Sequence, residues 1–168
     1  LIGRSARGRG AGGDPEKGEQ AAYESERSLK NEVEELEILI IDCAAGLANS
    51  NLAFLDSCNI KMIVVQDEPA SIADCYGVIK IESKKHEMEN IFVLPNRVKS
   101  QKEGKILFDK LNQVCMKFLE EPVYYIGSVE DYNLLRNISR KRESLYPNHR
   151  ASSAAANFNQ LVEKISEL

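Results

Sequence analysis

The sequence of 168 residues contains no tryptophan, two histidines and four cysteines, none of which form a Cys-x-x-Cys pair. His86 and His149 lie far apart in polar surroundings, which does not favour a metal site. The cysteines lie within apolar or helical patterns, and this predicts reduced, buried thiols rather than a disulfide framework or a zinc site. They are Cys43, Cys58, Cys75 and Cys115.

Long apolar runs and an excess of positive charge are missing as well. No apolar run approaches the ~20 residues of a membrane-spanning helix, and Gly3 and Arg4 leave no apolar core for a signal peptide after Leu1 and Ile2. The formal net charge of −4 argues against a nucleic-acid binder driven by overall electrostatics. We therefore expect a cytoplasmic domain with a substantial core and, because the first residue is not Met, a piece of a longer protein.

Residues 1–27 are poor in apolar side chains, and six of the ten glycines fall within the first 18 positions. Such a segment cannot offset the entropy lost on ordering, so we predict a disordered or non-homologous tail. Gly3 and Gly8 have the spacing of a phosphate-binding loop, but neither a preceding strand nor a following Gly-Lys-Ser/Thr is present. Residues 28–168 are predicted to form the organised part of the chain.

From Ser28 onward, apolar runs typical of buried strands alternate with helical patterns. The four runs are Ile38–Ile41, Lys61–Val65, Asn90–Leu94 and Val123–Gly127. Helices are predicted from Ser28, from an Asn49 cap, from a Ser71–Asp74 capping box, across 107–118, across 131–141 and across 158–165. The alternation predicts a three-layer α/β fold, in which a mostly parallel, twisted sheet has helices on both faces.

The carboxyl ends of parallel strands share one edge of the sheet, where α/β proteins bind their ligands. The polar residues predicted at this edge are Asp42, Asp67, Glu68, Asn96, Arg97, Glu130 and Asp131. Asp42 ends the first apolar run and small residues follow it. Two roles of Asp42 explain that pattern equally well. Its carboxylate could bind a nucleotide-bound magnesium ion, or it could cap the loop that follows. Asn96 can bond a purine edge with its side-chain amide, or it can bond its own turn.

Arg140–Arg142 form a short basic patch near the end of a predicted helix. The simpler interpretation is a solvated helix end, and the sharper one is a contact with anionic lipid or with an acidic partner. The sequence shows no Ser-His-Asp or Cys-His arrangement and no Gly-x-Ser-x-Gly elbow, so nucleophilic hydrolysis of that kind is not predicted.

Four segments carry a family pattern in order and spacing. They are residues 38–46 (I-L-I-I-D-C-A-A-G), 67–76 (D-E-P-A-S-I-A-D-C-Y), 96–104 (N-R-V-K-S-Q-K-E-G) and 125–129 (Y-I-G-S-V) with Arg136 beyond. Together they resemble the MinD/ParA-type ATPases with a deviant P-loop, and within that group the flagellar-number regulators of the FlhG/FleN type. The resemblance covers residues 29–168, and the E-P-x-S-[IL]-x-D-x-Y string is its most specific part.

The resemblance implies a function that depends on ATP and magnesium, in the P-loop NTPase fold. Asp42 matches the Walker B aspartate, a catalytic residue that holds magnesium through water, and Gly46 matches the switch II glycine near the γ-phosphate. Asn96 matches the asparagine that reads the adenine, with Arg97 beside it.

The resemblance also implies partners and a location. The family forms an ATP-dependent homodimer in the cytoplasm that contacts the inner face of the cell membrane through a C-terminal amphipathic helix. Its partners are the SRP-type flagellar GTPase and the flagellar switch-complex (C-ring) proteins, and no nucleic acid is expected.

The chain also departs from the family pattern. No counterpart of the glycine-rich loop K-G-G-x-G-K-[ST] occurs in these 168 residues. The resemblance therefore implies the C-terminal part of a MinD-like domain with an incomplete N-terminal portion, and we expect this chain alone not to hydrolyse ATP. Glu130 and Tyr132 stand where the family has Pro and Asp, at the far wall of the adenine pocket.

Three functions stay open. The intact Asp42, Gly46 and Asn96 favour part of an ATPase that regulates flagellar number and placement. Glu130 and Tyr132 favour a non-catalytic interaction module that has kept the sheet. A sibling protein of division-site placement or DNA partitioning is the third, and the E-P-x-S string argues against it.

Overall fold

The computed structural model describes residues 38–43, 49–85, 88–146 and 148–168. The chain forms two compact units, Leu1–Asn59 and Ile60–Leu168. The predicted tail and the helix predicted from Ser28 lie outside the described residues. In the part of the chain that the structure describes, no helix is long and apolar enough to cross a bilayer.

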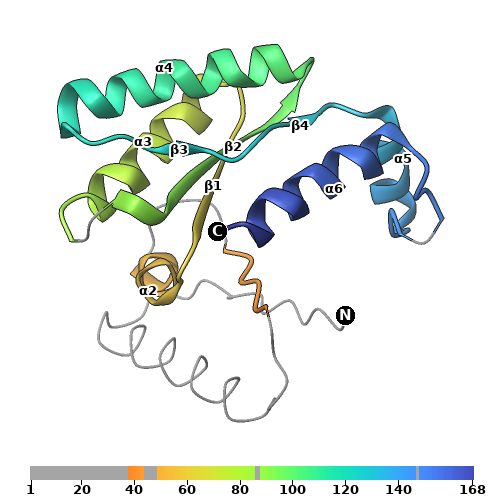
Figure 1. Ribbon diagram of the computed structural model, residues 1–168, viewed down its shortest axis with the longest axis horizontal. Coiled ribbons are helices and arrows are strands. Elements are labelled where there is room, and N and C mark those ends of the chain that lie inside the picture. The colour runs from red at the N-terminus through yellow and green to blue at the C-terminus, as the bar shows by residue number, and fades with distance from the viewer. Residues whose placement is uncertain (1–37, 44–48, 86–87, 147) are drawn as a thin grey trace, which may run out of the picture. The chain divides into compact units, whose positions relative to one another are not determined.

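The described part of the first unit consists of one helix and one irregular segment (Figure 1). Helix α2 spans Asn49–Ser57, so the helix predicted there is confirmed. Residues 38–43 have no regular secondary structure, and Ile38 and Ile40 are 64% and 75% exposed. The prediction of a buried strand is wrong for these residues. Their β-branched side chains favour an extended chain, but a strand also needs a neighbour to bond its backbone groups, and this segment pairs with no strand that the structure describes.

The second unit is built on a parallel sheet whose central strand is β2 (Ile91–Val98). The other strands are β1 (Lys61–Val65), β3 (Tyr124–Tyr125) and β4 (Val129–Glu130). Each of the three pairs with β2 in parallel. The predicted parallel α/β architecture is therefore confirmed.

Helices cover both faces of this sheet, as Figure 1 shows. Helices α3 (Pro69–Glu82) and α4 (Gln101–Leu119) lie on one face, and α6 (Ser153–Ser166) packs on the other. The 3-10 helix η1 (Met88–Asn90) leads into β2, and α5 (Asn133–Lys141) follows β4. This arrangement gives the three layers that the sequence predicts.

The alternation of side chains along β2 divides the core in two. Ile91 and Val93 belong to the cluster beneath α3 and α4, whereas Leu94 belongs to the cluster that contains Leu161 of α6. Successive residues of a strand point to opposite faces, so a strand that is covered on both sides is apolar at consecutive positions. That uninterrupted run is the signal by which the sequence predicts the strand.

Several element boundaries differ from the prediction, and those of β2 and α3 have a clear physical reason. The apolar run predicts an end of β2 at Leu94, but the strand continues to Val98 because β4 pairs with its last residues. Helix α3 begins at Pro69, where the fixed φ and missing N–H of proline suit a first helical turn. The predicted capping box is wrong, since the Ser71 hydroxyl instead accepts a hydrogen bond from the Gln66 backbone N–H at 3.0 Å.

A buried ion pair joins the first residue of β1 to the last residue of α3. Lys61 Nζ and Glu82 Oε2 lie 3.5 Å apart, and the two side chains are 9% and 1% exposed. Desolvation offsets most of the attraction in such a pair, but removal of one partner leaves a buried charge without compensation. The pair therefore restricts how α3 can dock on β1.

A group of four residues, which we call the polar clamp, joins α4, β4 and α6. Asn157 Nδ2 donates to the Ser128 carbonyl at 2.8 Å, and Asn157 Oδ1 accepts from the Glu130 N–H at 3.1 Å. Gln101 Nε2 donates to the same Ser128 carbonyl at 3.1 Å and to Glu130 Oε1 at 3.3 Å. Ser128 and Asn157 are 0% and 6% exposed, so these bonds replace water around buried polar groups.

Ser128 also occupies the space beside a glycine of α4. Its hydroxyl lies 2.8 Å from the Tyr125 hydroxyl. A Cβ added at Gly104 would collide with Oγ and Cβ of Ser128. The absence of a side chain at Gly104 therefore lets the beginning of α4 lie directly against the segment between β3 and β4.

None of the four cysteines forms a disulfide, which agrees with the prediction of thiols. Cys75 and Cys115 are buried, and Cys58 is half-buried. Cys43 is exposed, so the prediction of a buried thiol is wrong there, because residues 38–43 form no covered strand.

We expect Asn157→Ala to lower the free energy of unfolding by about 2 kcal/mol, because it leaves the Glu130 N–H without its partner inside the protein. Urea denaturation followed by circular dichroism measures the change. Gln160→Ala, an exposed position on the same helix, is the matched control and should stay within about 0.5 kcal/mol of the parent. Equal losses in the two variants would contradict a role for the polar clamp.

Burial raises the pKa of the Cys75 and Cys115 thiols from 9.0 to about 11. The thiolate is the reactive form, so both should be alkylated slowly in the folded protein at neutral pH and rapidly after unfolding. Because the folded pKa is the higher one, the neutral thiols stabilise the fold fully below pH 9.0, and this contribution is lost as the pH rises towards 11. Mass spectrometry after iodoacetamide treatment counts the modified thiols, and rapid labelling of both in the folded chain is the contrary result.

Candidate functional site

The carboxyl ends of the strands bring polar residues of the second unit to one edge of the sheet. Asn96 lies near the end of β2, in register with Val129 of β4. The predicted site residues at this edge are Asp67 and Glu68 after β1, Asn96 and Arg97 in β2, Glu130 in β4 and Asp131 after it. The expected grouping of these six residues at the ligand-binding edge follows from the parallel pairing.

The side chain of Asn96 is half-buried, and it bonds the backbone of the next residue of β2. Asn96 Oδ1 accepts a hydrogen bond from the Arg97 backbone N–H at 2.9 Å. This is the local role that is common for Asn near turns. The bond uses only the carbonyl of the amide, so Nδ2 keeps two donors for an acceptor atom such as a purine ring nitrogen.

Arg97 connects the ends of β1 and β2. Its backbone has φ 57, the left-handed region that non-glycine residues seldom adopt. Its guanidinium Nη1 donates to Gln66 Oε1 at 3.4 Å. Apart from this bond, the Arg97 side chain is exposed at this edge of the sheet.

Glu130 and Tyr132 form the part of the edge beyond Asn96. Glu130 Oε1 accepts from the Gln101 backbone N–H at 3.2 Å, which adds a bond to the polar clamp. Burial, the charge of Glu130 and a hydrogen bond with Glu130 raise the pKa of the Tyr132 hydroxyl. The carboxylate at position 130 is therefore held by neighbours on two sides.

Asp42 and Gly46 belong to the first unit. Asp42 is exposed in the irregular segment 38–43, and Gly46 lies outside the described residues. Among the residues that the structure describes, no three His, Cys, Asp or Glu side chains come together as a metal site. A hard carboxylate oxygen suits magnesium, which keeps several waters and commonly binds through one or two carboxylates and the phosphates of its substrate. Asp42 fits that role as a single ligand.

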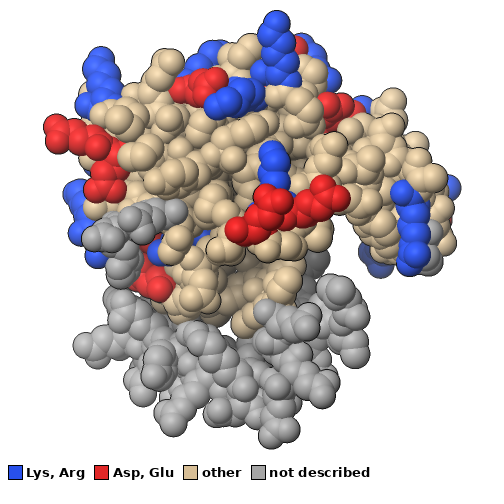
Figure 2. Space-filling model, in the orientation of Figure 1, with Lys and Arg blue, Asp and Glu red and all other residues tan. Residues whose placement is uncertain are grey.

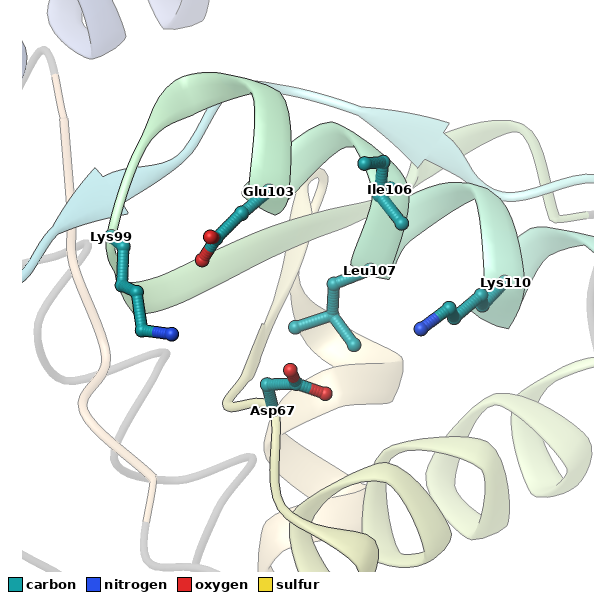
Figure 3. A pocket seen from close by; sticks show the side chains of 6 residues that line it. All are labelled: Asp67, Lys99, Glu103, Ile106, Leu107 and Lys110. Carbon is teal, nitrogen blue, oxygen red and sulfur yellow. The ribbon is translucent and has the colours of Figure 1, made fainter.

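A cavity of about 210 Å³ lies beside this edge, under the first turns of α4 (Figure 3). It is lined by Asp67, Lys99, Glu103, Ile106, Leu107 and Lys110. Pockets for drug-sized ligands measure about 300–1,000 Å³, so this cavity is too small for a nucleotide. The residues that line it come from the loops after β1 and β2 and from α4.

Three residues that support the edge are not signalled by the sequence. Gln101, Ser128 and Asn157 look like ordinary polar residues of two helices and a loop, and only the fold brings them together. The one available signal is the position of Gln101 next to the Ser100 N-cap, whose hydroxyl accepts from the Glu103 N–H at 3.2 Å.

The chain is similar to two curated proteins over most of its length. It is 33% identical over 130 residues to the antiactivator FleN of Pseudomonas aeruginosa, which is 77% of this chain and 46% of FleN. It is 29% identical over 134 residues to the flagellum site-determining protein YlxH of Helicobacter pylori, which is 79% of this chain and 44% of YlxH. The chain thus spans a little under half the length of these relatives.

Solved structures agree on the fold. The MinD cell division protein of Aquifex aeolicus matches with a TM-score of 0.62 and 18% identity, over 92% of this chain and 61% of that protein. The cell division ATPase MinD of Pyrococcus furiosus matches with a TM-score of 0.62 and 20% identity, over 92% of this chain and 59% of that protein.

No protein-family model matches the chain. The parallel sheet with helices on both faces matches the fold of the two MinD proteins. The chain is a MinD/ParA-type relative of the FlhG/FleN proteins.

Proposed function

We propose that this chain is part of a MinD-like regulator of flagellar number and placement. The supporting observation is the match to FleN and YlxH over 77% and 79% of the chain. Because the chain spans less than half of either relative, the activity and the partners of the whole protein are part of the proposal. They are ATP hydrolysis, ATP-dependent homodimerisation, and contacts with an SRP-type flagellar GTPase and with C-ring proteins.

In this proposal the chain supplies half of an ATP site. Asp42 holds the magnesium ion through water, and Gly46 lies near the γ-phosphate. Asn96 reads the adenine through Nδ2, since its Oδ1 is already bonded to the Arg97 N–H. Arg97, exposed at the same edge, adds a positive charge beside the nucleotide. Magnesium, when bound, would neutralise charge on the phosphates.

The other half of the site must bring the phosphate loop. Phosphates bind chiefly to the backbone N–H groups and the lysine of a glycine-rich loop, and the 168 residues contain no Gly-Lys-Ser or Gly-Lys-Thr. Activity therefore requires a polypeptide segment that supplies such a loop.

A second candidate is a non-catalytic interaction module. It is favoured by Glu130 and Tyr132, which replace the Pro and Asp of the family pattern. The hydrogen bond between these two residues and the bonds from Gln101 to Glu130 support this candidate, because they engage both side chains in contacts within the protein.

We expect the purified 168-residue chain to show no ATP turnover above a protein-free blank in the presence of magnesium, because it has no phosphate loop. A coupled phosphate-release assay measures this. Turnover that Asp42→Ala abolishes would contradict the half-site proposal, since it would mean that the chain binds phosphates by itself.

A chimera tests the cellular function. The part of FleN that this chain does not match is joined to residues 28–168 and expressed in FleN-deficient Pseudomonas aeruginosa, and flagella per cell are counted by electron microscopy. We expect the count to return to that of the parent strain. The Asp42→Ala chimera should fail, whereas Glu163→Ala, an exposed position on α6, should succeed.

The outcomes separate the candidates. A chimera that accumulates normally but leaves the flagellar count unchanged contradicts the flagellar role. An Asp42→Ala chimera that restores the count as well as the parent chimera supports the non-catalytic module instead.

A further inference from the structure

The last residues of β2 carry Asn96, and among the described strands only β4 pairs with them. The register of β1 with β2 ends at Pro95, and that of β3 with β2 ends at Val93. Beyond Pro95, Asn96 is in register with Val129 of β4. The position of Asn96 at the ligand-binding edge therefore depends on where β4 lies.

The backbone after Asn96 is irregular and needs that support. The register of β2 with β4 shifts between Asn96 and Val98, and Arg97 between them has φ 57. A residue with a side chain keeps this left-handed conformation only where its surroundings hold it. The Val98 carbonyl accepts a hydrogen bond from the Asp131 N–H at 2.9 Å, so the chain that follows β4 fixes the far side of the irregularity.

Strand β4 has only two residues, Val129 and Glu130, so the sheet gives it few hydrogen bonds of its own. Asn157 of α6 supplies two more. Its Nδ2 donates to the Ser128 carbonyl at 2.8 Å, and its Oδ1 accepts from the Glu130 N–H at 3.1 Å. These bonds lie on either side of Val129, the residue that pairs with Asn96.

Apolar packing keeps Asn157 in place. Helix α6 lies alongside β4 (Figure 1), and Leu161, one turn after Asn157, belongs to the same core cluster as Val129. Figure 2 shows acidic and basic side chains mixed over the visible face of the molecule, but among the described residues no ion pair joins α6 to β4. The link between this helix and this strand thus consists of apolar contacts and uncharged hydrogen bonds.

We propose that Asn157 is a positioning residue for base recognition, because it fixes β4 and thereby holds Asn96 where Nδ2 can meet a purine. Asn157 is 6% exposed and both ends of its amide are bonded, so it acts through β4 and not on the base itself. This inference rests on the proposed function, in which Asn96 reads the adenine.

A purely structural role is the simpler explanation of Asn157, since buried polar groups are normally hydrogen-bonded. That role predicts only a loss of stability when the side chain is removed. The positioning role predicts in addition a local loosening of β4 and a loss of base selectivity. The two roles therefore differ in measurable ways.

The first measurement uses the whole 168-residue chain and needs no nucleotide. Amide hydrogen exchange followed by NMR reports on the bond from the Asp131 N–H to the Val98 carbonyl. We expect Asn157→Ala to speed the exchange of the Asp131 amide at least about tenfold more than that of the amides of β1, because the opening is local. Equal acceleration at both places would mean that Asn157 contributes only to global stability.

The second measurement uses the chimera of FleN with residues 28–168. Isothermal titration calorimetry gives the dissociation constants for ATP and for UTP in the presence of magnesium. The two nucleotides share the triphosphate and the ribose, so the ratio of the constants reports contacts with the base. We expect the parent chimera to bind ATP at least about tenfold more tightly than UTP, since one hydrogen bond is worth up to about that factor.

Removal of the bonds from Asn157 should reduce this preference. We expect Asn157→Ala to lower the ratio about fivefold and Gln101→Ala about threefold, the latter because the Gln101 backbone N–H keeps its bond to Glu130. Once Asn96→Ala is present, Asn157→Ala should have no further effect on the ratio, because it acts through Asn96.

The matched control is Ile79→Val, which removes a methyl group from the fully buried core on the other face of the sheet. It lowers stability without touching β4, so the ratio should stay unchanged. Circular dichroism checks that each variant is folded, and Gln101→Ala alone decides if Asn157→Ala is not.

The outcomes separate this inference from the proposed function. A parent chimera that binds neither nucleotide, or binds both equally, contradicts the proposed adenine reading and this inference with it. A parent chimera that prefers ATP, with the same ratio in the folded clamp variants or an equal loss in Ile79→Val, overturns the positioning role alone.

Discussion

The pairing of β2 with three parallel neighbours is the constraint on which the second unit depends. The described strands β1, β3 and β4 each pair with β2. The two clusters of the core lie on the two faces of β2. The same strand carries Asn96 to the edge where ligands bind in this class of fold. Packing and the candidate site are therefore set by one element, and any shift in its register would turn core residues outwards and move Asn96 at the same time.

Much of this architecture could be predicted from the pattern of apolar residues. The run Ile91–Leu94 contributes to the core clusters on both faces of the sheet, so composition and length sufficed to predict it. The end of β2 could not be predicted, because Pro95 lacks an N–H and normally signals the end of a strand. The pairing of Asn96 with Val129 carries β2 past it, and that depends on a distant segment. Residues 38–43 could not be predicted correctly for the same reason. Their composition favours a strand, but no described strand pairs with them.

The candidate site likewise contains some residues that could be predicted from the sequence and others that could not. Asn96 and Arg97 could be found from a motif, because their spacing along the chain is local. The polar clamp could not, since Gln101 and Asn157 come together only through folding. Asn96 Oδ1 bonds the adjacent Arg97 backbone N–H, which is the local role that the sequence offered for this residue. The ligand role stays a prediction, and it is compatible with this bond because Nδ2 is not part of it.

The close approach of Gly104 to Ser128 has a consequence for the divergence of related proteins. A methyl group at position 104 has no room while Ser128 fills the space, and a larger residue at position 128 would push on the start of α4. We therefore expect the residues at positions 104 and 128 to change together, because neither can become larger while the other stays as it is. An alignment of homologues would show this as covariation between positions 104 and 128, which belong to different segments of the chain.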